Sequence, residues 1–317
     1  NKDNAGKTLR ILGDVFAELT LFKGLTAKTD FALDYNTFNQ RAYSSKYNEG
    51  PITSQSISNL NQQNIVSKTW TWSNTLNYNT TIGKHAIDVL AGTEAIRYYS
   101  EFFTAYRDNF PVDILDGRYL DAGQGLPKNT GSGIKSTLFS LFAKANYTYN
   151  DRYLFSATVR RDASSKLADG YNTQVFPAFS AGWRLSEEDF IKNSLPFVSN
   201  MKLRFGWGQT GNQEIAAYAA YSSFGLDLYN TTYDMNGSNT SSVPGIAQKR
   251  YGNDQLKWET TTQTNIGLDL GMFNERVTFT ADYFNKDTKD LLVQPKQPAV
   301  FGQAAAPYIN GGSMNNT

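Results

Sequence analysis

The chain has 317 residues, with 30 Lys and Arg against 29 Asp and Glu, and a formal net charge of +1. This balance does not support a general nucleic-acid binder, which usually carries a basic excess, so we expect no nucleic-acid partner. The absence of cysteine excludes disulfides, cysteine-ligated zinc, iron–sulfur clusters and a thiol nucleophile. With a single histidine as well, we expect no catalytic residues, no metal site and no cofactor.

Mean hydropathy is −0.48, and no stretch approaches the roughly 20 apolar residues of a membrane-spanning helix. A helical membrane protein is therefore excluded. A membrane β-barrel stays open, because its strands alternate apolar and polar residues and average out hydrophilic. The first residues lack the apolar segment of a signal peptide, so we expect a mature or internal start.

In chain order, alternation with a period of two residues predicts five hairpins. Along residues 139–149 the odd positions are Phe, Leu, Ala or Tyr, and most even positions are polar. Successive side chains of a strand point to opposite faces, so each run has one apolar and one polar face. The paired runs are 9–21 with 25–35, 70–78 with 87–91, 139–149 with 153–162, 179–185 with 201–207, and 266–270 with 277–283.

These runs give about ten strands, many of about 10–13 residues, which suits tilted membrane-spanning strands of about 9–11 residues. The turns within hairpins are short. The returns between hairpins are long, roughly residues 36–67, 97–134, 211–256 and 287 onward. Short turns on one side and long loops on the other are typical of bacterial outer-membrane barrels. We expect Tyr35, Trp70, Trp72 and Trp207 near strand ends by the long loops, at the lipid–water boundary.

Several ordered blocks resemble the SusC/RagA family of TonB-dependent outer-membrane transporters of Bacteroidetes. Residues 141–162 read LFAKANYTYNDRYLFSATVRRD and residues 176–184 read FPAFSAGWR. Further similar blocks are SEEDFI at 186–191, LRFGWGQTGNQ at 203–213 and WETTTQTNIGLD at 258–269. The resemblance implies an all-β, antiparallel transmembrane barrel of 22 strands, with an N-terminal plug and a segment that contacts TonB.

Against that family pattern, we expect residues 1–317 to form part of a single barrel domain, with the plug and the TonB-contacting segment outside them. Missing strands would complete the barrel, because an open sheet edge in lipid leaves unpaired backbone groups. Residues 309–317 look like the approach to a further strand.

Three local motifs have plain structural interpretations. Residues 206–211, GWGQTG, match the dinucleotide pattern G-x-G-x-x-G, but the glycines begin in a strand and no helix follows, which predicts a strand end and loop start. His85 is expected as a surface turn residue. Ser186 and the acids at 187–189 predict the start of a short helix, with a calcium site as the alternative.

Charged residues with the polar parity of their strands are expected to face the barrel lumen, either as a hydrated wall against the plug or along the substrate path. These are Lys144, Arg160, Asp162, Arg184, Lys202, Arg204, Asp269 and Asp282. Aromatic residues of the longest loop could stack on sugars or peptides, or pack the loops together or against a partner. These are Tyr218, Tyr221, Phe224, Tyr229 and Tyr233.

The resemblance implies a nutrient importer of the cell outer membrane, embedded in its lipid as a multi-pass β-barrel. TonB would drive uptake of an oligosaccharide or oligopeptide, and a SusD-like lipoprotein would cover the extracellular mouth. A passive porin or structural barrel, and a soluble β-sandwich binding module, remain alternatives. An enzyme is disfavoured, since no nucleophile or acid–base pair stands out.

Overall fold

The computed structural model describes residues 2–50, 54–112, 114, 117–226, 232–234, 237–238, 242–298, 300, 302 and 304–317. One antiparallel sheet dominates it, with the strand order β1-β2-β5-β6-β7-β8-β9-β10-β15-β16-β19. Its strands are β1 (Lys2–Phe22), β2 (Leu25–Ser44), β5 (Asn59–Ile82), β6 (His85–Asp108), β7 (Lys128–Tyr149), β8 (Tyr153–Ser164), β9 (Thr173–Arg184), β10 (Val198–Asn212), β15 (Glu259–Met272), β16 (Val277–Lys289) and β19 (Ser313–Asn316).

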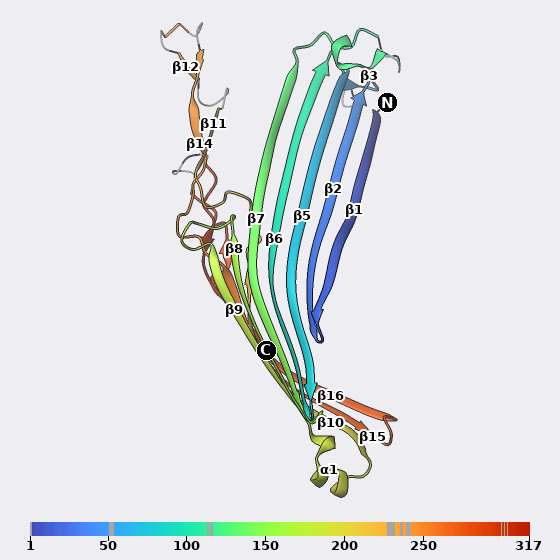
Figure 1. The fold of residues 1–317 in the computed structure, drawn as a ribbon. Coiled ribbons are helices and arrows are strands. Elements are labelled where there is room, and N and C mark those ends of the chain that lie inside the picture. Colours follow the sequence, from blue (N-terminus) through green and yellow to red (C-terminus); the bar gives the residue numbers. More distant parts are fainter. Residues whose placement is uncertain are drawn as a thin grey trace. The chain divides into compact units, whose positions relative to one another are not determined.

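The ten predicted strands are confirmed, and the expected further strand is β19, which pairs with β16. Almost every strand lies beside its sequence neighbours, and Figure 1 shows β1, β2, β5, β6 and β7 running side by side. Among the described residues, no helix is long and apolar enough to cross a bilayer.

The small elements lie in the connections between the sheet strands. They are β3 (Tyr47–Asn48), β4 (Ser54–Gln55), η2 (Leu120–Ala122), η3 (Leu185–Glu187), α1 (Asp189–Ser194), β11 (Ser223–Leu226), β12 (Thr232–Asp234), β13 (Ser242–Pro244), β14 (Ile246–Arg250), β17 (Leu292–Val293) and β18 (Ile309–Asn310). All but η3 and α1 lie in connections that return the chain to the next hairpin.

The short turns follow from their residues. Asn150 and Asp151 have φ values of 50° and 55°, and the Arg152 amide donates to the Tyr149 carbonyl at 3.0 Å. A two-residue turn with positive φ at both central residues matches the twist of the flanking strands, and Asn and Asp tolerate positive φ. In two other turns only one central residue has a positive φ: Gly24 at the second central position and Gly83 at the first.

The predicted long returns are too long, because the strands continue well into them. Residues 36–44, 59–67, 97–108 and 128–134 belong to β2, β5, β6 and β7. Trp70, Trp72 and Tyr35 therefore lie inside their strands, and the prediction that they mark strand ends is wrong. In most of these segments both faces are polar, and in residues 97–108 both faces carry aromatic residues, so neither kind shows a clear alternation for a sequence pattern to detect.

The chain divides into two compact units. The first consists of residues 1–17, 30–72 and 95–137, and the second of residues 18–29, 73–94 and 138–317. Each has a small apolar core formed by strand ends and the connections next to them. In the first unit it contains Tyr43, Leu60 and Phe110, and the Phe110 amide donates to the buried Ser58 hydroxyl at 3.0 Å.

The second unit has the larger core, beneath its long connections. Its buried members are Leu167, Ala168, Phe176, Ile215, Ala219, Ala220, Leu256 and Trp258. The Trp258 indole also donates to the Asn172 carbonyl at 2.9 Å. This core fastens both ends of the longest connection, residues 213–258, to the connection between β8 and β9.

Candidate functional site

In the second unit, the sheet has one apolar and one polar face. The strand register aligns a row of apolar side chains from β7 to β16, namely Tyr149, Tyr153, Trp183, Leu203, Leu268 and Ala281. Apolar residues of this face are exposed, for example Phe155 and Phe179 at 42% each. An exposed apolar face of this extent indicates contact with lipid or a partner.

All eight charged residues predicted to share a face do so. Lys202 lies opposite Arg184 on β9 and opposite Asp269 on β15, and Arg204 lies opposite Gly182 and Gly267. On β7, β8 and β16, Lys144, Arg160, Asp162 and Asp282 have the same parity. We call this side the polar face.

Arg204 is held by two carboxylates. Its Nε and Nη2 donate to Asp269 at 2.7 and 2.9 Å, and its Nη2 lies 3.0 Å from Asp282. Gly267 makes room for this cluster, because a Cβ there would lie 2.5 Å from Asp282 Oδ1 and 2.7 Å from Arg204 Cζ. Paired charges in fixed geometry stiffen the wall and leave Arg204 little freedom to meet a ligand.

Arg160 forms the second cluster. It donates to Glu94 at 2.8 Å, to Ser140 at 2.7 Å and to Asp162 at 2.7 Å, and it lies over the Phe142 ring. Ser140 and Asp162 are buried. Burying charges is costly unless they are paired, so this cluster fixes neighbouring strands.

The lysines differ from these arginines. In the part of the chain that the structure describes, neither Lys144 nor Lys202 donates a hydrogen bond to another side chain, and Arg184 reaches only the Asp151 carbonyl at 3.4 Å. Lys202, Arg184, Asp269 and Glu275 border a polar hollow of about 330 Å³ toward the short-turn end. These cations remain available to a neighbouring molecule.

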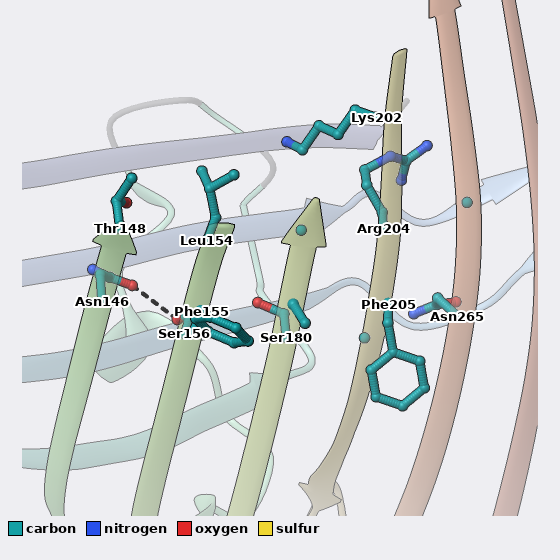
Figure 2. A pocket seen from close by; sticks show the side chains of 14 residues that line it. Asn146, Thr148, Leu154, Phe155, Ser156, Ser180, Lys202, Arg204, Phe205 and Asn265 are labelled. Atoms are coloured by element: carbon teal, nitrogen blue, oxygen red, sulfur yellow. Dashed lines mark hydrogen bonds between the residues drawn. The ribbon is translucent and has the colours of Figure 1, made fainter. Parts of the chain in front are cut away.

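A larger hollow of about 500 Å³ lies beside Arg204 and is lined mostly by residues of the polar face (Figure 2). Two cross-strand rows of the polar face line most of it, and apart from Leu154 and Arg204 their side chains are small or amide-bearing; Phe155, Ala181 and Phe205 complete the lining. The lining includes Asn146, Thr148, Ser156, Ser180, Gly182, Lys202, Arg204, Gly206, Asn265 and Gly267. Figure 2 shows Lys202 and Arg204 along one side and the hydrogen bond from Ser156 to Asn146, 2.8 Å long.

At the short-turn end, Glu188 joins the sheet to α1. Its carboxylate accepts hydrogen bonds from Tyr153 at 2.7 Å, Trp183 at 3.1 Å and Arg152 at 3.1 Å. The Tyr153 and Trp183 hydrogen bonds lower the pKa of Glu188 below its ordinary value. The prediction of a short helix is confirmed, but its start was misplaced. Glu188 is the N-cap residue, and Ser186 is buried in the preceding 3-10 turn.

Two further sequence motifs are now placed. Residues 206–211 lie entirely within β10, so the prediction that Gly211 begins a loop is wrong. A Cβ on Gly211 would lie 2.1 Å from the Phe176 ring, so the glycine permits close approach. His85 begins β6, and its Nδ1 lies 2.8 Å from the Tyr147 hydroxyl.

The predicted loop aromatics lie in or near the longest connection. Tyr218 and Tyr221 are half-exposed beside the buried core, and Tyr221 donates to Asp169 at 3.3 Å. Coulombic repulsion from Asp169 raises the pKa of Tyr221. Phe224 on β11 and Tyr233 on β12 are 64% and 63% exposed. Tyr229 lies outside the described residues.

Sequence reasoning missed the polar-face partners from distant strands. Glu94 binds Arg160, and Asp88 accepts from Asn146 at 3.4 Å and from Asn79 at 3.3 Å. The parity of β6 was the available signal, since both acids alternate with Ile87, Val89 and Ala91.

Comparisons with known proteins agree with this geometry. Residues 6–317 match the family model described as TonB dependent receptor-like, beta-barrel. TonB-dependent receptor P39 of Formosa agariphila is 31% identical over 95% of this chain and 28% of its own length. TonB-dependent receptor SusC of Bacteroides thetaiotaomicron is 32% identical over 75% of this chain and 23% of its own.

Among solved structures, the RagAB peptide transporter superposes with a TM-score of 0.86 at 24% identity, covering 99% of this chain and 34% of that one. The sheet therefore has the fold of a segment of that barrel. The chain spans about a quarter to a third of the length of these similar proteins.

Proposed function

Because the chain belongs to the TonB-dependent receptor β-barrel family and is of the SusC/RagA type, we propose that it forms part of the wall of a nutrient importer in the cell outer membrane. The imported molecule is an oligosaccharide or an oligopeptide. The observation that carries the proposal is the two-faced sheet of the second unit, with exposed apolar residues on one side and all eight charged residues on the other.

In this proposal the apolar face contacts lipid and the polar face lines the lumen. Residues 1–317 are part of one barrel domain, and the plug and the TonB-contacting segment belong to other parts of a longer protein. The size of the relatives supports this division. A SusD-like lipoprotein on the extracellular side is supported by the similarity to SusC and RagAB.

Within the lumen wall, the partnered arginines and the unbonded lysines have different roles. Arg160 and Arg204 hold strands together, whereas Lys144 and Lys202 meet the plug or the passing substrate. Lys202 borders both hollows, where its ammonium group can bind a carboxylate of a peptide or a hydroxyl of a sugar.

The test is uptake by the full-length protein, expressed with its lipoprotein neighbour, of labelled oligopeptides and oligosaccharides. Uptake should require TonB, and Lys202→Gln should reduce it while leaving the amount of assembled barrel unchanged. Lys84→Gln, in an exposed turn, is the matched control. Uptake that persists without TonB would identify a passive pore, and a protein that stays in the aqueous fraction without detergent would refute the membrane placement.

A further inference from the structure

The first unit carries an alternating row of tyrosines and lysines across four neighbouring strands. Lys68 on β5 lies over the Tyr35 ring of β2, 5.5 Å from its centroid, and Lys135 on β7 lies over the Tyr99 ring of β6 at 5.7 Å. Ser67 and Ser100 contact each other through their hydroxyls at 3.0 Å. Their neighbours Lys68 and Tyr99 are therefore also opposite each other, on the other face of the pair. We call Tyr35, Lys68, Tyr99 and Lys135 the boundary row.

The boundary row ends an apolar band on the same face. On β2 the preceding residues of this parity are Phe31 and Leu33, and on β5 they are Trp72 and Trp70. Phe31 stacks on Trp70, with ring centroids 6.2 Å apart. Beyond the row, toward the long connections, the same face carries Thr37 and Asn39 on β2 and Val66 and Asn64 on β5. On β6, Glu101 and the exposed Phe103 also lie beyond the row, so the face becomes more polar at the boundary row but keeps some apolar residues.

The charge at this boundary is mainly positive. Lys68, Lys135 and Arg97 are all exposed, and Arg97 lies opposite Trp70 by the register that the two serines set. Glu101 is the one carboxylate on this part of the face in the described residues, and it accepts the Tyr99 hydroxyl. Aromatic rings with polar tips favour the bilayer interface, and lysine stems reach along apolar surface to place their charge in the head-group layer.

The second unit shows the same change independently on β8. Its apolar face runs through Phe155 and Val159, and the next residue of that parity is the exposed Arg161. Arg161 lies opposite Leu141 on β7. A guanidinium at the end of an apolar run has the same preference for an anionic layer.

We propose that the boundary row, with Arg97, binds the phosphate of a phosphorylated lipid head group in the bilayer leaflet at the long-connection end. Charge complementarity favours this occupant, because the cationic side chains at the edge of the apolar band outnumber the single carboxylate there and leave an excess of positive charge. The tyrosine rings hold the lysine ammonium groups toward the head-group layer. The inference rests on the proposed membrane placement, but it concerns the lipid-facing side and is independent of what the barrel transports.

The experiment uses the full-length protein in detergent, with phosphorylated lipid A as the probe and native mass spectrometry as the measurement. Lys68→Gln combined with Lys135→Gln removes two charges and keeps most of the side-chain length. We expect binding to weaken roughly thirty-fold, from the contribution of two lysines near an anionic surface. Lys128→Gln is the matched control, because Lys128 also lies over a tyrosine ring, that of Tyr106, but at the other parity of β7.

The proposal is overturned if the double variant binds lipid A as tightly as the unaltered protein, or if dephosphorylated lipid A binds equally well. Displacement of the lipid by an equal concentration of inorganic phosphate would overturn the lipid as occupant. Heat-modifiable migration on gels checks that each variant is a folded barrel. If neither the unaltered protein nor any variant shows heat-modifiable migration, the proposed membrane placement is wrong. If all of them show heat-modifiable migration and lipid binding is unchanged in the double variant, only the boundary-row inference is wrong.

Discussion

Replacing Leu268 with arginine tests the assignment of the two faces directly. Leu268 lies between Leu203 and Ala281 on the apolar face, four residues from the end of β15 at Met272. At about 3.4 Å per residue and a tilt of about 45°, its depth is about 10 Å into an apolar band of about 25 Å. Arginine close to the bilayer midplane costs about 2–4 kcal/mol, and we expect Leu268→Arg to destabilise the assembled barrel by that amount.

The assay is urea unfolding of the full-length protein folded into lipid vesicles. Asn265→Arg is the matched control, because Asn265 is on the polar face of the same strand and borders the larger hollow. We expect it to cost less than about 0.5 kcal/mol. Leu141→Arg should also cost more than Asn265→Arg, because Leu141 lies on the apolar face and an arginine there would sit directly opposite Arg161, whose like charge repels it. Equal losses for Leu268→Arg and Asn265→Arg would show that the faces are assigned incorrectly.

The other predictions concern the wall, the base and the connections. Gly267→Ala should cost about 1–3 kcal/mol in the same urea assay, because the added Cβ would displace the Arg204 cluster. Gly206→Ala is the control and should be nearly neutral, because its Cβ would lie 3.9 Å from the nearest atom. Equal effects of the two substitutions would contradict the close packing at Gly267. Folding lowers the pKa of Glu188 below its unfolded value of 4.5. The stabilisation of α1 by the ionised Glu188 is therefore fully present above pH 4.5, and it is lost as the pH falls through the lower pKa of the folded protein. After correction for the intrinsic pH dependence of exchange, amide hydrogen exchange of residues 189–194 should therefore become faster at acid pH in the unaltered protein. In Glu188→Gln the corrected exchange rate should not change with pH. Leu256→Ala should cost about 2–5 kcal/mol locally and expose residues 213–258 to protease, and unchanged cleavage would argue against the buried core as their anchor.

The sequence predicted best where one strand face is apolar and the other polar. Between residues 139 and 162 the alternation assigned Leu141 and Val159 to one face and Lys144 and Arg160 to the other, and the register agrees. The turn at Asn150 was equally predictable from the sequence, because few residue types tolerate positive φ.

Prediction failed where strands lose their alternation and where distant strands meet. Tyr35 and Trp70 were expected near strand ends because polar residues follow on both faces, but backbone hydrogen bonds continue the strands without an apolar face. Arg160 was recognised as a polar-face residue, but its partner Glu94 is 66 residues away, and a single sequence holds no information on the register that joins them.

On the face that we propose contacts lipid, the strands do not stop at the boundary row. β2, β5, β6 and β7 continue for seven to nine residues beyond it before their connections begin. In the proposed membrane placement, at about 3.3 Å per residue and a tilt of about 45°, these segments would form a rim about 20 Å above the head groups. A molecule arriving from outside would first contact hydrogen-bonded sheet and not flexible loops. The backbone of the entrance should therefore keep its shape when individual side chains are substituted.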